Sequence, residues 1–241
     1  MIPLGVEFAA REPIVAGRLA PVGIGVMAGG LVTGVRERPF ETIGEFTELK
    51  VFDLIEVEMI KSNENKITIS GKNNKDVVVN NKNGKLKIKM NIEKLFDGNN
   101  TKVTLYYTTV DVLDANEGAK IYSNDEIKQF ELDLRSQEGG IINAVCDVSY
   151  LNVKAVTGGI VEVSGKSKKQ NISLLTGGIF KGENNETENT EVSINAAGEA
   201  YINASKVVDI KIRAGGDVFV YGNPETVNES KVLGGRVKLM N

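Results

Sequence analysis

The sequence predicts an all-β protein, a parallel β-solenoid (β-helix) with coils of about 19 residues that turn at glycine corners. Three observations predict it: glycine pairs at a fixed spacing, alternating apolar residues before each pair, and no helical apolar pattern. The spacings between successive pairs are 19, 19, 20, 18 and 19 residues. The pairs are Gly139-Gly140, Gly158-Gly159, Gly177-Gly178, Gly215-Gly216 and Gly234-Gly235, with Ala197-Gly198 in the remaining place.

Each repeat consists of a strand, a tight glycine corner, a second short strand and a polar return. Leu151, Val153 and Ala155 alternate with polar neighbours, as do Phe130, Leu132 and Leu134. This period of two is typical of a strand with one buried face. The returns at 165–171 and 182–190 are rich in Lys, Asn and Glu, and their composition predicts loops.

Two architectures fit strands of equal length with no helix between them. One is an antiparallel meander or sandwich, and the other is a parallel solenoid in which equivalent strands stack in register. Glycine at the same phase of six repeats favours the solenoid, because stacked coils must all turn at the same place. Glycine suits such a corner, since it accepts positive φ and allows neighbouring backbones to approach.

The composition changes sharply near residue 38, which predicts two parts in the chain. Four of the five prolines lie within the first 39 residues, whereas the first lysine is Lys50. We expect residues 1–38 to be a leader, disordered or foreign to the fold; the alternative is a membrane or sorting segment at 14–35, where no secretory signal is recognisable. Residues 39–241 form a single predicted β-helix domain, with irregular opening coils at 39–112 and regular repeats at 113–241.

The composition also bounds the chemistry. The chain has no His and one Cys, which removes Ser-His and Cys-His catalysis and His-ligated metals. A net charge of −3 argues against a nucleic-acid partner. No motif indicates a catalytic residue, a cofactor or a metal. We interpret Cys146 as a packing residue, because no histidine is present to activate its thiol. The densest short acidic set, Asp111, Asp114 and Glu117, reads as a solvated turn.

Tyrosines near the strands are the candidate ligand contacts, because aromatic faces can stack on sugars. They are Tyr106, Tyr107 and Tyr221, and their alternative role is packing on the pleated surface. In the last repeat, Glu229 and Lys231 replace apolar residues at the interior phase, so this rung is expected to be a polar cap.

From about Arg38 to Asn241 the chain resembles the head GIN domain family of putative auto-transporter adhesins. The features that carry the resemblance are Phe40-Glu41-Thr42-Ile43, the stretch 46–51, the glycine corners, and the closing stretch 218–224 (VFVYGNP). The chain departs from the family in its Gly-Gly corners and in lacking a recognisable export signal. The resemblance implies a right-handed parallel β-helix located in the cell envelope, with a role in adhesion and no catalytic residue to carry over.

We therefore expect a non-enzymatic envelope protein that binds a surface polysaccharide or a protein, without a cofactor. One alternative is a carbohydrate-active enzyme, a lyase or glycosidase that uses carboxylates from successive coils. Another is a structural or assembly module that forms homo-oligomers through an open edge at 237–240.

Overall fold

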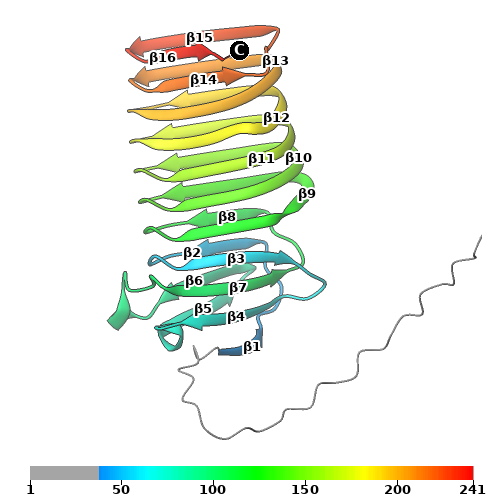
Figure 1. The fold of residues 1–241 in the computed structure, drawn as a ribbon, viewed down its shortest axis with the longest axis vertical. Helices are drawn as coiled ribbons and strands as arrows, with labels where there is room; N and C mark the ends of the chain where they lie inside the picture. The colour runs from blue at the N-terminus through cyan, green and yellow to red at the C-terminus, as the bar shows by residue number, and fades with distance from the viewer. Residues whose placement is uncertain (1–37, 241) are drawn as a thin grey trace, which may run out of the picture. The chain divides into compact units, whose positions relative to one another are not determined.

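The computed structural model describes residues 38–240, which lie in the second of the chain's two compact units, Val35–Asn241. The predicted leader falls almost wholly outside the described residues. The described part contains 16 strands in one continuous sheet and two short 3-10 helices, Asn74–Asp76 and Ile92–Lys94. Parallel coils of about 19 residues stack into a β-solenoid of about seven turns (Figure 1), which confirms the predicted fold class. No helix in this part of the chain has the length and hydrophobicity that crossing a membrane requires.

Five long strands form the regular part of the stack. They are β9 (Lys120–Gln137), β10 (Ile141–Val156), β11 (Ile160–Leu175), β12 (Gly178–Ile194) and β13 (Gly198–Ala214). Each pairs in parallel with the next, and β10 lies on β11 with Val153 beside Ile172, an offset of one repeat. Ile172 in turn lies beside Val192 of β12, and Val192 beside Ile210 of β13. These four side chains are at most 3% exposed, so equivalent apolar residues form a continuous ladder inside the stack.

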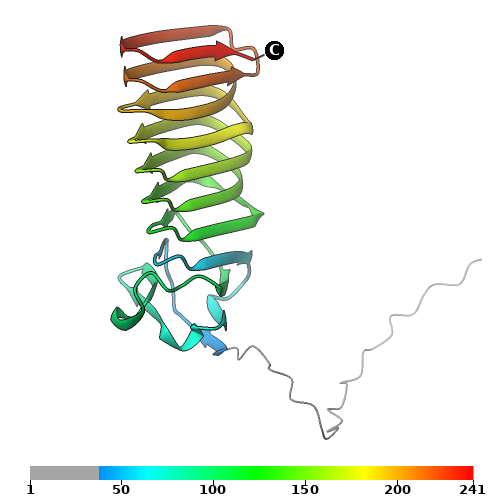
Figure 2. The ribbon, with the colours of Figure 1, turned by 60° about the vertical axis from the view of Figure 1, so that its left-hand side comes forward.

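The opening part mixes parallel and antiparallel pairing (Figure 2). β2 pairs in parallel with β6 and β8, and β3 with β7 and β9, so these strands already follow the path of the coils. β1 pairs antiparallel with β4, β4 with β7, and β5 with β6. The strands are β1 (Arg38–Thr42), β2 (Glu48–Val51), β3 (Glu56–Lys61), β4 (Lys66–Gly71), β5 (Val77–Lys82), β6 (Lys85–Met90), β7 (Thr101–Tyr107) and β8 (Val112–Ala115).

Three short strands end the stack. β14 (Asp217–Tyr221) pairs in parallel with β13, and β16 (Arg236–Leu239) pairs in parallel with β14. β15 (Thr226–Leu233) pairs in parallel with the second half of β13. Glu229 lies beside Ile210 and Lys231 beside Ile212, so two charged residues occupy the positions that are apolar one coil earlier. Their side chains form an ion pair at 2.7 Å between Nζ and Oε2.

The two glycines of a corner meet different physical requirements. Gly158 has φ +71° and open space around its α-carbon, so it supplies the left-handed turn. Gly159 lies against the previous coil, where an added β-carbon would be 2.3 Å from the carbonyl oxygen of Ser136. Gly140 and Gly178 approach the oxygens of Ala115 and Ala155 at similar distances. Gly139, Gly177, Gly215 and Gly234 repeat the first role, while Gly198, Gly216 and Gly235 have positive φ next to side chains of earlier coils.

The polar returns predicted as loops are strand, and that prediction is wrong. Residues 165–171 belong to β11 and residues 182–190 to β12, each bending in mid-strand. At the bend two or more consecutive residues point outward, as do Ser149 and Tyr150 between the buried Val148 and Leu151. The same break in β9 leaves Phe130 68% exposed, although simple alternation with Leu132 predicts that it is buried.

Candidate functional site: a groove along the bend of the coils

The largest hollow on the described surface follows the bend through five successive coils. It is an open groove of about 730 Å³, which we call the bend groove. Its lining residues come from β9 to β13, because the bends of successive coils stack on one another; most of them point outward, and Val148, Ser167 and Thr187 are buried at its floor. They are Lys128, Gln129, Phe130, Asp147, Val148, Ser149, Lys166, Ser167, Lys168, Glu186, Thr187, Glu188 and Ser205.

An aromatic pair, of which Phe130 lines the groove, lies at its edge. Phe130 of β9 lines it, and Tyr150 of β10 packs against Phe130 with ring centroids 5.2 Å apart and a tilt of 56°. The two residues are 68% and 41% exposed. A second hollow of about 420 Å³ shares Gln129 and Phe130 with the first and continues to Asp111 and Asp133. Phe130 therefore lines two neighbouring hollows, and Tyr150 packs against it.

Charges of alternating sign line the groove in register. Asp147 lies between Lys128 and Lys166 on the neighbouring strands, and Lys166 lies beside Glu186. Lys128 donates a hydrogen bond from Nζ to Asp147 Oδ2 at 2.6 Å, which lowers the pKa of Asp147. Lys206 likewise bonds Glu188 at 2.7 Å and lowers its pKa. Both carboxylates are thus ionised and paired near neutral pH.

Behind the groove lies a buried polar cluster inside the coils. The side-chain amide of Asn185 donates to Ser167 and Gln170, each at 3.1 Å, and Thr190 accepts a bond from Gln170 at 2.9 Å. Cys146 lies beside this cluster, with Sγ 3.8 Å from the side-chain oxygen of Asn185. Burial raises the pKa of its thiol to about 12, so Cys146 is a protonated packing residue.

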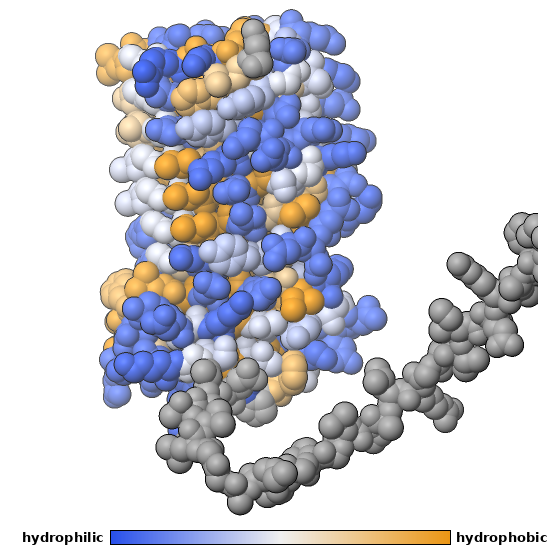
Figure 3. Space-filling view, viewed as in Figure 1, coloured by the Kyte–Doolittle hydropathy of each residue, from blue (hydrophilic) through white to orange (hydrophobic). Residues whose placement is uncertain are grey.

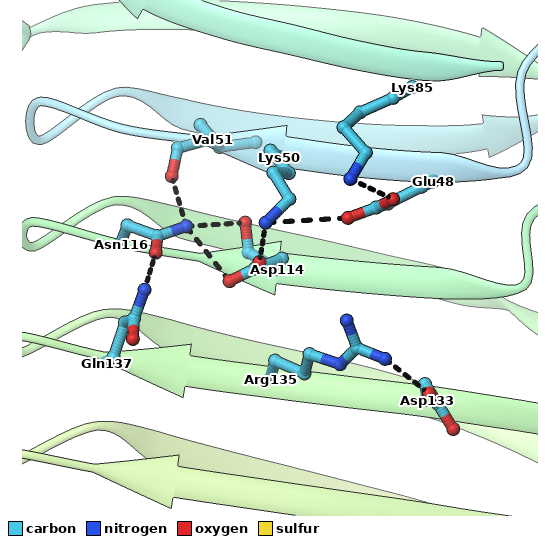
Figure 4. A network of polar contacts seen from close by, with 9 residues as sticks. All are labelled: Glu48, Lys50, Val51, Lys85, Asp114, Asn116, Asp133, Arg135 and Gln137. Carbon is cyan, nitrogen blue, oxygen red and sulfur yellow. Dashed lines mark hydrogen bonds and ion pairs between the residues drawn. The ribbon is translucent and has the colours of Figure 1, made fainter. Parts of the chain in front are cut away.

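A second polar network connects the opening strands to the regular coils (Figure 4). Lys50 of β2 donates to Asp114 of β8 at 2.6 Å and lies 3.4 Å from Glu48, whose carboxylate also pairs with Lys85 of β6 at 2.7 Å. Burial opposes the charge of Lys50, but its bonds to Asp114 and Glu48 outweigh burial and raise its pKa. Asp114 is buried, and its full set of partners indicates a structural role.

The tyrosines predicted from the sequence lie elsewhere, and none of them lines the bend groove. Tyr107 is 1% exposed and belongs to the core, so its ring offers no face at the surface, which differs from the expectation. Tyr106 is partly exposed and packs on Phe40, with ring centroids 5.9 Å apart. Tyr221 is partly exposed on β14, beside Asn203.

Glu117 and Asp53 are two carboxylates that interact, and burial together with the charge of Asp53 raises the pKa of Glu117. Among residues 38–240, no group of three or more acidic or thiol side chains is arranged to hold a metal ion. Figure 3 shows one face of the stack, on which hydrophilic side chains predominate and hydrophobic ones form small separate patches. This face of the stack is therefore mostly polar.

Comparison with known proteins identifies one protein family and several similar structures. The family described as "Putative auto-transporter adhesin, head GIN domain" matches residues 45–224. A putative adhesin from Bacteroides fragilis has a similar structure, with a TM-score of 0.79 and 19% identity over 86% of this chain and 98% of that one. A putative adhesin from Parabacteroides merdae gives a TM-score of 0.65 at 15% identity, and a putative lipid binding protein from Parabacteroides distasonis 0.65 at 16%. Each covers 87% of this chain and 98% of the other.

At these identities the structural neighbours show the fold alone, and no curated protein sequence matches the chain. The family match covers most of the described solenoid, from β2 through the end of β14. Together with the stacked coils, it establishes that this chain belongs to the head GIN domain family of putative auto-transporter adhesins.

Proposed function

We propose that this protein is a non-enzymatic adhesin of the cell envelope that binds an extended, uncharged surface polysaccharide in the bend groove. The observation that carries the proposal is the exposed side chain of Phe130, which lines two neighbouring hollows and packs on the exposed ring of Tyr150. Aromatic rings present a broad apolar face with little conformational entropy to lose, which suits the C–H faces of sugar rings. Membership in a family of putative auto-transporter adhesins supports the envelope location.

The charges in the groove favour a neutral ligand. Three lysines line it (Lys128, Lys166 and Lys168), and three carboxylates balance them (Asp147, Glu186 and Glu188). A polyanion would meet the carboxylates, and a polycation would meet the lysines. Sugar hydroxyls can both donate and accept hydrogen bonds, so alternating charges and the hydroxyls of Ser149 and Ser205 can all serve them.

The shape of the groove favours a linear polymer. The lining comes from the same part of successive coils, so a polar or charged group recurs at the strand spacing of about 4.8 Å, with the sign of the charge alternating from coil to coil. A chain lying along the solenoid axis would meet several equivalent contacts. Individually weak contacts then add up over several sugar residues.

Binding to an array of neutral and charged glycans tests this function. We expect the full chain to bind neutral polysaccharides, and Phe130→Ala and Tyr150→Ala each to weaken binding by about tenfold or more, as at other aromatic contacts. Phe219→Ala is the matched control. Phe219 of β14 stacks on Tyr201 of β13 with ring centroids 4.7 Å apart, and neither residue lines the groove. Binding that survives the groove variants, or no glycan binding at all, would overturn the proposal.

The enzyme alternative has its own readout. A lyase or glycosidase would release oligosaccharides from a bound polymer. We expect no new reducing ends or unsaturated products after prolonged incubation with each polymer that binds. Polysaccharide cleavage that disappears in Asp147→Asn or Glu188→Gln would show that the protein is an enzyme rather than an adhesin.

A further inference from the structure

The C-terminal end of the stack presents two strand edges. Within residues 38–240, β15 pairs only with β13 and β16 only with β14, so no described strand covers the outer edge of either (Figures 1 and 2). An uncovered edge carries a row of N–H and C=O groups that can pair with another chain. The backbone groups at this end are therefore available to pair with a strand of a partner.

The inner face of β15 has an unusual order of side chains. Val227 and Leu233 occupy the two ends of the inward row, with Glu229 and Lys231 between them. The row thus reads apolar, negative, positive, apolar. Reversing its direction and exchanging the signs of the charges gives the same order, so the row is complementary to itself in an antiparallel arrangement.

We propose that β15 pairs antiparallel with β15 of a second copy of this chain, around a two-fold axis at Ser230. In an antiparallel pair, residues directly opposite one another lie on the same face. Glu229 then faces Lys231 of the second copy, and Val227 faces Leu233 of the second copy. Each contact occurs twice, as a two-fold interface requires.

The same features argue against other occupants of this end. Inward-pointing charges on an edge strand disfavour an apolar partner strand, because the charges would lose their hydration without compensation. A copy docked head to tail would bring the opposite end of the stack, where β1 pairs antiparallel with β4 and β5 with β6, so its strands do not continue the parallel ladder of β13 and β15. Glu229 and Lys231 already pair with each other within β15, and the antiparallel second copy gives each of them a further partner of opposite charge.

The proposal goes beyond the adhesin function and does not depend on the bend groove. A tail-to-tail dimer would carry two grooves on one rigid body. Two grooves that engage one polymer or one surface bind with higher avidity than either alone.

Sedimentation velocity of the 241-residue chain over a range of concentrations tests the proposal. We expect a monomer–dimer equilibrium in the wild type. Glu229→Lys places like charges opposite one another, as does Lys231→Glu, and each is expected to raise the dimer dissociation constant by about tenfold or more. Thermal unfolding of each variant checks that it folds. The side chains of Glu229 and Lys231 are both partly exposed, so we expect the monomer to tolerate either substitution.

Two rescue experiments separate pairing from a general effect of charge. The double variant Glu229→Lys/Lys231→Glu restores opposite charges and should dimerise like the wild type. An equimolar mixture of the two single variants should form the mixed dimer. A wild-type chain that stays monomeric at every concentration would overturn the proposal, as would single variants that dimerise normally or a double variant that fails to recover.

Discussion

Asn185 donates a hydrogen bond to Gln170 across the inside of the bend, from Nδ2 to Oε1 at 3.1 Å. The two residues lie on neighbouring coils, and both side chains are fully buried. The coils turn here without a Gly-Gly pair, although Gly165 of β11 has φ +113°, and buried polar side chains bond to one another on the inner side of the bend. The outward-pointing residues of this bend form most of the groove lining.

Removing this amide should destabilise the whole domain. Asn185→Ala removes the bonds to Gln170 Oε1 and Ser167 Oγ inside the stack, which costs about 2 to 3 kcal/mol of unfolding free energy. Asn184→Ala is the matched control, because Asn184 is the neighbouring residue of the same type and is exposed. Urea unfolding of both variants measures the difference, and equal stabilities would contradict the structural role of the cluster.

The two glycines of one corner should tolerate substitution unequally. At Gly158 the space is open, so Gly158→Asn should cost less than about 1 kcal/mol, since Asn accepts positive φ. Gly159→Ala would force a β-carbon against the backbone of Ser136 and should cost about 2 kcal/mol or more. If denaturant midpoints ranked these variants in the reverse order, the assigned roles would be wrong.

The thiol of Cys146 should be inert in the folded protein. Its pKa, raised to about 12 by burial, keeps it protonated at pH 8, and its side chain is not accessible. We expect no reaction with a thiol reagent in native buffer and one equivalent in denaturant. Rapid labelling of the native protein would show that the bend opens.

Stability at low pH should depend on Glu48. Burial raises the pKa of Glu48, but bonds from Lys85 and Lys50 outweigh burial and lower it. A lowered folded pKa contributes stability above the unfolded pKa, and this contribution is lost as pH falls, between about pH 5 and the folded pKa. Glu48→Gln should therefore lose less stability than the wild type on acidification. The control is Glu64→Gln, whose carboxylate is 73% exposed and should leave the acid profile unchanged.

The sequence alone predicts the regular coils well. Glycine pairs such as Gly158-Gly159 recur because every coil must turn and stack at one place, and the apolar ladder from Val153 to Ile210 follows from that register. Stacking of neighbouring backbones leaves a local trace in the sequence, because only glycine fits where Gly159 approaches Ser136.

The bend and its groove could not be predicted in the same way. Gln170 and Asn185 are polar, and their burial depends on hydrogen bonds with each other rather than on any local pattern. Polar segments that contain such residues therefore resemble loops in sequence. Phe130 and Tyr150 become neighbours only through the parallel register, and a break in alternation around Tyr150 is the one local signal of the outward turn.

Fluorescence from a single tryptophan beside the groove tests the proposed binding most directly. The chain has no Trp, so Tyr150→Trp introduces one reporter next to Phe130, and Phe219→Trp places one away from the groove. Titration with a neutral polysaccharide that binds the wild type should give a saturable change in emission from Tyr150→Trp and none from Phe219→Trp. A change confined to Phe219→Trp, or equal in both variants, would contradict binding in the bend groove.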